Sequence, residues 1–121
     1  MDSEYIRDLF AEFGAVQMRR LFGGAGVYAD GVMFALVHGG VIFLKADDSS
    51  IAAFEAEVCA SFSYQTKTGR RALTSYWRLP ERLYDDPGEL ARWAGQALAI
   101  ARRGGKPTSV KVKARKKKAR R

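Results

Sequence analysis

The segment from residue 16 to residue 45 constrains the fold of this chain most. Short runs of β-branched, aromatic and aliphatic residues alternate there with Gly23-Gly24, Asp30-Gly31 and Gly39-Gly40. Asp-Gly and Gly-Gly pairs favour hairpin turns, because the tight turns between antiparallel strands need residues at positive φ. The pattern predicts an antiparallel meander with strands over residues 16–22, 25–29, 32–38 and 41–45.

The third of these strands is apolar on both faces from Val32 to Val37. A strand with one solvated face normally alternates apolar and polar residues. We therefore expect one face of this strand to meet helices. The other face needs either a second layer or a partner subunit.

Three helices are predicted around the meander from apolar spacing and capping residues. The first covers residues 3–13, and the second covers residues 49–58 after the capping cluster at residues 47–50. The last is the clearest: Asp86 suits its N-cap, Pro87 its first position, and an apolar stripe continues to residue 101 before Gly104-Gly105 ends it.

Two further strands lie between the second and third helices. Phe62 and Tyr64 indicate a short strand, and alternation from residue 73 to 79 predicts another, with residues 66–71 as an exposed loop between them. The resulting fold class is α+β, two-layer, in the order α-β(3–4)-α-β(2)-α. A chain of 121 residues fits one such domain.

The charge of the chain is divided unevenly along its length. Residues 102–121 hold 11 of the 21 Lys and Arg residues and none of the 13 acidic residues, so the preceding part has a net charge of −3. We predict a globular domain over residues 1–103 and a basic disordered tail over residues 104–121. The predicted nucleic-acid-binding residues of this tail are Lys106, Lys111, Lys113, Arg115, Lys116, Lys117, Lys118, Arg120 and Arg121.

A run of this charge density neutralises phosphates and releases counterions, which gives salt-sensitive binding without sequence readout. The tail has no aromatic residue for base stacking. Its apolar residues are small and few, so a membrane-surface helix is a poor alternative. A solubilising terminus without a partner is the other interpretation of the same charge.

The chain offers no recognisable catalytic, cofactor or metal site. Gly23-Gly24-Ala25-Gly26 precedes a strand rather than a helix, so it indicates a turn or bulge and no phosphate loop. His38 and Cys59 are the only His and Cys, too few for a zinc site, and Cys59 fits a small buried apolar residue. The Asp47-Asp48 and Asp85-Asp86 pairs precede helices, where capping explains them.

Two groups of basic residues remain within the body. Arg19 and Arg20 are neighbours on a strand, so their side chains point to opposite faces and at most one faces inward. Lys67, Arg70 and Arg71 form a basic loop. A solvated hairpin tip explains this loop, and a phosphate contact that assists the tail is the alternative.

Several ordered blocks of residues together resemble a known family. They are residues 18–28, 30–36, 43–47 and 75–80. These blocks look like the N-terminal domain of the TfoX/Sxy family of bacterial competence regulators, over about residues 3–103. The family-motif residues, with a structural or partner-binding role, are Arg19, Arg20, Phe22, Gly23, Gly24, Gly26 and Gly31.

The resemblance implies a twisted antiparallel sheet with flanking helices, related to the secretion-chaperone-like architecture. It also implies a role in regulating DNA-uptake genes together with a cyclic-AMP receptor protein. Full-length members carry a second, helix-hairpin-helix domain, and here a Lys/Arg tail follows the first domain instead.

The first hypothesis is therefore a non-enzymatic regulatory domain that binds a protein partner, such as a transcription factor, and holds nucleic acid through its tail. A homodimeric adaptor or chaperone-like module without a nucleic-acid role is the second. An enzyme is a distant third, because no nucleophile–base pair is in place. No signal peptide or apolar span is found, so we expect a soluble cytoplasmic protein without cofactor or membrane contact.

Overall fold

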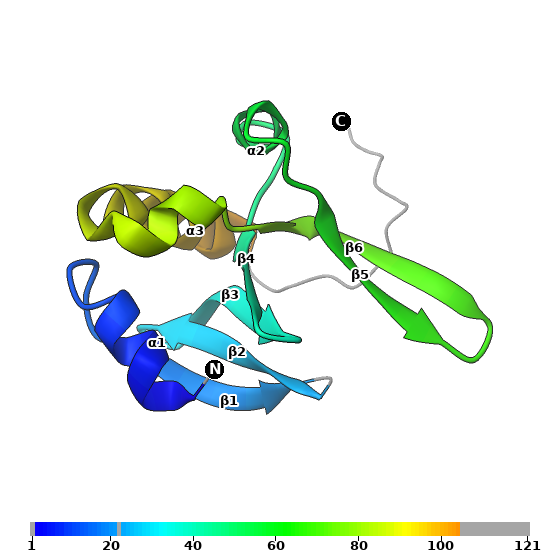
Figure 1. Cartoon of the computed structure of the whole chain (residues 1–121), viewed down its shortest axis with the longest axis horizontal. Coiled ribbons are helices and arrows are strands. Elements are labelled where there is room, and N and C mark those ends of the chain that lie inside the picture. Colours follow the sequence, from blue (N-terminus) through cyan, green and yellow to red (C-terminus); the bar gives the residue numbers. More distant parts are fainter. Residues whose placement is uncertain (1, 22, 105–121) are drawn as a thin grey trace.

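A computed structural model of the protein describes residues 2–21 and 23–104 (Figure 1). The elements in chain order are α1 (Ser3–Leu9), β1 (Gln17–Leu21), β2 (Gly24–Ala29), β3 (Val32–His38), β4 (Val41–Lys45), α2 (Ile51–Ala56), β5 (Ser61–Thr66), β6 (Gly69–Arg78), the 3-10 helix η1 (Glu81–Asp85) and α3 (Pro87–Gly104). All strand pairs are antiparallel, in the order β1-β2-β3-β4-β6-β5. The predicted α+β class and element order are confirmed.

Turn residues fix the meander β1–β4. Asp30 and Gly31 have φ of 53° and 78°, and Gly39 and Gly40 have φ of 60° and 76°. Positive φ at both central residues is what a tight hairpin turn requires, and Asn, Asp and Gly tolerate it best. The observed strands accordingly begin and end within one residue of those predicted, and β3 and β4 agree fully.

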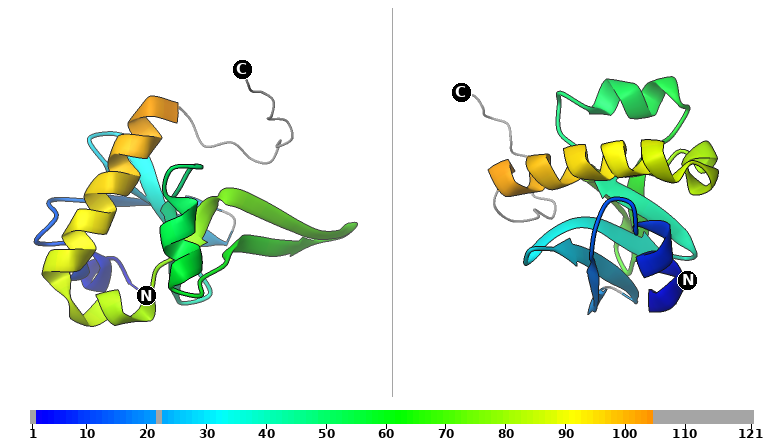
Figure 2. Two further views of the ribbon diagram at one scale, coloured as in Figure 1. Left: turned by 90° about the horizontal axis from the view of Figure 1, so that it is seen from above. Right: turned by 90° about the vertical axis from the view of Figure 1, so that its left-hand side faces the viewer.

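Helices α1 and α3 cover one face of the sheet and enclose the main core (Figures 1 and 2). Phe34 on β3 is fully buried, and its ring lies 5.6 Å from that of Phe10. The apolar stripe of α3 contributes Leu90, Ala94, Ala97, Leu98 and Ala101. One face of β3 therefore meets helices, as expected.

The second face of β3 lies in a smaller apolar cluster formed by the sheet itself. Met33 and Leu36 of β3 are buried there against residues of β5 and β6. These partners are Phe62, Leu73 and Tyr76, with Leu21, Tyr28, Phe43 and Tyr64 packed around them. The sheet thus supplies the second layer that the apolar strand needs.

The two short helices end earlier than predicted. Helix α1 stops at Leu9 because the N–H groups of Phe13 and Gly14 both donate to the carbonyl of Phe10, which closes a turn instead of extending the helix. Helix α2 covers only residues 51–56, and Val58 follows it at a φ of 60°. The predictions of 3–13 and 49–58 were too long at these ends.

The predicted loop over residues 66–71 is wrong. Strands β5 and β6 are joined by the two-residue turn Lys67–Thr68, and Thr66 Oγ1 donates a 2.7 Å hydrogen bond to the carbonyl of Gly69. Arg70 and Arg71 therefore belong to β6. The hairpin projects away from the helices and from β1–β4 (Figures 1 and 2).

No helix within residues 2–21 and 23–104 combines the length and the apolar character needed to cross a bilayer.

Candidate interaction site

The family-motif arginines lie on opposite faces of β1, as predicted. The guanidinium carbon of Arg19 is 5.1 Å from the centroid of the Tyr28 ring, in cation–π geometry on the face of the smaller apolar cluster. Both arginines are exposed. Arg19 therefore contacts the Tyr28 ring at the surface, and the charges of both side chains are available there.

Two motif glycines are required by close packing of strands. A methyl group at Gly24 would collide with the backbone carbonyl of Val37 on β3, and one at Gly26 would lie 2.9 Å from Met33 Sδ. Neither glycine begins a helix, because both lie on β2. The predicted turn or bulge over residues 23–26 therefore holds only for Gly23, because Gly24, Ala25 and Gly26 pair with β1 within the strand.

The remaining motif residues form turns or lie outside the described residues. Gly31 has a φ of 78° in the β2–β3 turn, and Gly23 has the same φ before β2. Phe22 is outside the described part of the chain. The motif glycines that the structure describes thus have backbone roles.

Lys45 is the unexpected residue of the sheet. It lies at the end of β4, only 7% exposed, with its Nζ 5.2 Å from the centroid of the Tyr76 ring. Burial lowers the pKa of Lys45, and the negative charge of Asp47 partly opposes this. A buried cation of this kind is costly unless it has close polar partners.

Tyr76 is fully buried in the same cluster. Its hydroxyl has no hydrogen-bond partner among the described residues, and burial together with nearby Tyr28 raises its pKa. Sequence reasoning missed Lys45 and Tyr76. The alternation of Ile42 and Leu44 with Phe43 and Lys45 could have placed Lys45 on the second face of the sheet.

Replacing Lys45 with methionine is expected to stabilise the protein by about 1 kcal/mol at pH 7, because burial of the charge is removed. The folded pKa of Lys45 lies below the unfolded value of about 10.4. Between these two pKa values the unfolded state binds more protons at Lys45 than the folded state does. The stability of the wild type therefore rises with pH in that window, whereas the stability of Lys45→Met does not.

Urea unfolding across pH 7 to about 10.4 checks this prediction. Lys67→Met at the exposed hairpin turn is the control and should leave both stability and its pH dependence unchanged. A Lys45→Met protein less stable than the wild type at pH 7 would contradict the prediction, since the contact with Tyr76 would then outweigh the burial cost.

His38 and Cys59 do not lie in a catalytic arrangement. The His38 ring packs edge-on at 5.2 Å from Phe62. Cys59 is only half-buried rather than fully buried, its thiol contacts the carbonyl of Glu57, and burial raises the pKa of that thiol. Within residues 2–21 and 23–104, no three His, Cys, Asp or Glu side chains come together as a metal site would require.

The acidic pairs lie at helix starts, and capping explains one better than the other. Asp86 Oδ1 accepts from the N–H of Glu89 at 3.2 Å and caps α3 as predicted. Asp47 instead binds the N–H and hydroxyl of Ser49, whereas Ser50, at the N-cap of α2, makes no side-chain cap bond. The predicted capping cluster thus orders the turn before α2.

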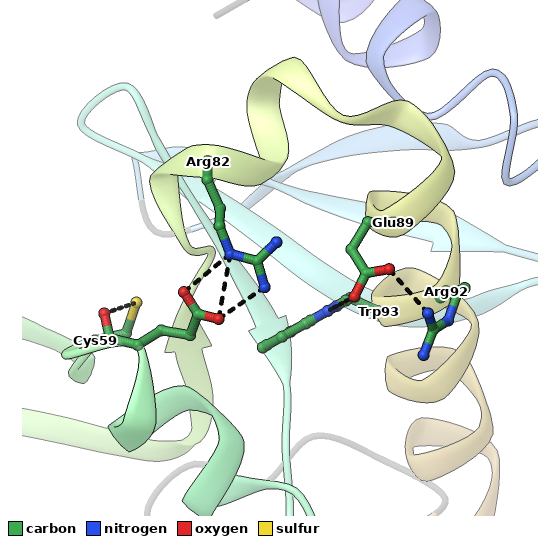
Figure 3. Close-up of polar contacts among 6 residues, drawn as sticks. Cys59, Arg82, Glu89, Arg92 and Trp93 are labelled. Atoms are coloured by element: carbon green, nitrogen blue, oxygen red, sulfur yellow. Dashed lines mark hydrogen bonds and ion pairs between the residues drawn. The ribbon is translucent and has the colours of Figure 1, made fainter.

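An ion pair connects Glu57, directly after α2, with η1, and a second carboxylate, Glu89, orders α3 (Figure 3). Arg82 donates through Nε and Nη2 to Glu57, with Nη2 at 2.7 Å from Oε2. Glu89 accepts from Trp93 Nε1 at 3.2 Å and from Arg92 at 2.9 Å. Among the described residues, these side chains hold η1 and α3 in place, and they surround no reaction centre.

The first two arginines of the basic run belong to the body. Arg102 pairs with Asp30 at 2.7 Å, and Arg103 pairs with Asp47 at 3.0 Å. Both lie in the last turn of α3, where a cation also suits the helix dipole. The nine basic residues from Lys106 to Arg121 that were predicted to bind nucleic acid lie outside the described residues.

The fold and the placement of the motif define the class of this protein as an antiparallel α+β domain in which Gly24 and Gly26 permit close packing of β2. The model of the TfoX N-terminal domain matches residues 8–101. The chain belongs to the TfoX N-terminal domain family.

The chain is also similar to Protein Sxy of Escherichia coli (strain K12). The two are 28% identical over 100 residues, which cover 78% of this chain and 45% of that protein. The chain thus matches less than half the length of this curated relative. The family match ends at residue 101, so the basic run after α3 lies outside it.

Proposed function

We propose that this chain is a non-enzymatic regulatory domain of the competence-regulator type. Its body binds a protein partner, such as a transcription factor, and its basic tail holds the complex at nucleic acid without reading sequence. Membership of a regulatory family supports the first part. The observation that carries the second part is the separation of charge between an acidic body and a tail without acidic residues.

The ion pairs of α3 place the charge boundary at the end of this helix. Arg102 and Arg103 form surface ion pairs with Asp30 and Asp47, so they belong to the body, which then has a net charge of −1 over residues 1–103. Nine basic residues follow from Lys106 onward, with no carboxylate among them. Their proximity in sequence favours phosphate contacts, which release counterions and weaken steeply with salt.

Deletion of residues 106–121 tests the proposal. The full chain is expected to bind duplexes of unrelated sequence equally well and to lose affinity as salt rises. The deleted chain should bind at least about tenfold more weakly at low salt, because the sequence-independent affinity comes from phosphate contacts. Fluorescence anisotropy with labelled duplexes measures both, and far-UV circular dichroism checks that the body remains folded.

A full-length variant with the nine tail residues changed to Gln separates charge from chain length. It should behave like the deletion, whereas Arg102→Gln with Arg103→Gln should keep the affinity of the full chain. Binding of DNA by the deleted body as tight as that of the full chain would refute the tail model.

The second candidate function is a homodimeric adaptor that has no nucleic-acid role. It is favoured by the open, uncharged edge strand β5. Sedimentation of the chain without residues 106–121 distinguishes it, since a strict monomer excludes the dimer.

A further inference from the structure

Strand β5 forms one edge of the sheet and has no charged residue along its length (Figure 1). Edge strands of monomeric proteins usually carry Lys, Pro or a strong bulge, which prevent pairing with another chain. The opposite edge, β1, carries Arg19 and Arg20. Between Ser61 and Thr66 there is no Lys or Pro, and the one irregularity is a register shift against β6 between Ser61 and Phe62, at the start of the strand.

The register of the hairpin shows which backbone groups of β5 point outward. Thr66 and Gly69 close the two-residue turn, so hydrogen-bonded pairs with β6 fall on even-numbered residues of β5. The carbonyl of Ala60, another even-numbered residue, also points toward β6, because it accepts from the N–H of Arg78 at 2.9 Å. The N–H and C=O groups of Ser61, Ser63 and Gln65 therefore point to the open edge.

We propose that β5 binds β5 of a second copy of this chain, antiparallel about a two-fold axis at Ser63. Only residues with outward groups can face one another in hydrogen-bonded pairs. With Ser63 opposite Ser63, Ser61 faces Gln65 of the second copy and every outward group is used. A shift by one residue would oppose outward groups to inward ones, and a shift by two would leave one end unpaired.

This register also pairs the aromatic residues. Phe62 and Tyr64 lie on one face of β5, with ring centroids 5.6 Å apart and an interplanar angle of 20°. In the proposed pairing, Phe62 faces Tyr64 of the second copy at a non-hydrogen-bonded position, where side chains approach most closely. Four rings then form one row across the axis, continuous with the smaller apolar cluster.

The ends of the strand complete the interface. Val58, just before β5, is 93% exposed, which is unusual for a large apolar side chain. It also has a φ of 60°, which is unusual for a β-branched residue. The antiparallel register brings the turn Lys67–Thr68 of the second copy alongside this residue.

This inference specifies the surface for the dimeric candidate function, and it is independent of nucleic-acid binding by the tail. Ser63 faces itself across the axis, so it permits a charge-swap test in the full-length chain. Ser63→Lys and Ser63→Asp should each raise the dimer dissociation constant at least about tenfold, because like charges then face one another. An equimolar mixture of the two should recover the dimer.

Sedimentation velocity without nucleic acid measures these states, and circular dichroism confirms that each variant is folded. Gln17→Lys on the exposed edge strand β1 is the matched control and should remain dimeric. A monomeric wild type, a dimeric Ser63→Lys protein or dissociation by Gln17→Lys would each overturn the proposal. Tail-dependent DNA binding is measured separately, so failure here is distinguishable from failure of the regulatory proposal.

Cross-linking tests the register itself. In a Cys59→Ala background, Ser63→Cys should form an intermolecular disulfide, because Cα atoms of a hydrogen-bonded pair lie about 5.5 Å apart, within disulfide range. Gln17→Cys in the same background should not. Absence of the Ser63→Cys cross-link from a protein that sediments as a dimer would exclude the two-fold axis at Ser63.

Discussion

Replacing Gly24 by alanine is expected to reduce the free energy of unfolding by about 3 kcal/mol. The added methyl group would collide with the carbonyl of Val37 and lie 3.2 Å from the Cα of His38. Both contacts are with the backbone of β3, which cannot move aside as a flexible side chain can. To relieve the collision, β2 must move away from β3, and both strands contribute buried residues to the main core.

A second glycine provides the control for this substitution. Gly95 lies within α3, and a methyl group added there has no neighbour within 4 Å. Gly95→Ala should therefore increase stability by about 0.5–1 kcal/mol through helix propensity. Urea unfolding of both variants gives the comparison. Equal stabilities would show that β2 and β3 tolerate the extra methyl group.

Truncating Phe54 to alanine is the second large effect, with an expected loss of about 3–4 kcal/mol. Phe54 is the buried residue of α2 and is 2% exposed. Its ring lies edge-on to Trp93 at 5.0 Å and 6.2 Å from Trp77. Removing it leaves a cavity at the place where α2, β6 and α3 meet.

The exposed neighbour Glu55 allows a matched control in the same helix. Glu55→Ala should change stability by less than about 0.5 kcal/mol, because surface substitutions away from special contacts have small effects. Chemical unfolding gives the energies, and near-UV circular dichroism reports the packing of Trp77 and Trp93. A Phe54→Ala protein as stable as Glu55→Ala would mean that α2 is not held by this ring.

The meander and the last helix could be predicted because local chemistry specifies them. Asp30-Gly31 and Gly39-Gly40 require positive φ wherever they lie, so the strands on either side follow from the turns. Asp86 caps α3 through the N–H of Glu89, three residues away. In both cases the determining contacts are within a few residues in sequence.

The two errors have different origins, one in a local turn and one in a distant contact. Residues 66–71 look like a polar loop, but pairing of β5 with β6 continues to Thr66 and Gly69. The burial of Lys45 depends on Tyr76, which is opposite it only because β6 joins β4 across the intervening helix and strand. The contact of Lys45 with Tyr76 joins residues too far apart for sequence patterns to detect, whereas Thr66 and Gly69 are only three residues apart and their turn was overlooked.

For the candidate site, residue type and strand geometry predict the orientation of the arginines but not the packing of the glycines. The opposite orientation of Arg19 and Arg20 follows from strand alternation and is confirmed by the contact of Arg19 with Tyr28. The close approach of Gly24 to Val37 depends on the register of β2 against β3, which the sequence does not reveal. The tail residues remain a prediction from charge.

The ladder between β4 and β6 has three residue pairs, against four between β3 and β4 and six between β5 and β6. Three residue pairs join these strands, from Phe43 opposite Arg78 to Lys45 opposite Tyr76, and they connect a local meander to a local hairpin. Each of the two units can form from contacts close in sequence, whereas the ladder requires closure of a long loop. Docking of the hairpin onto β4 is thus expected to be the late step in forming this sheet, and we expect the same junction to open early during unfolding.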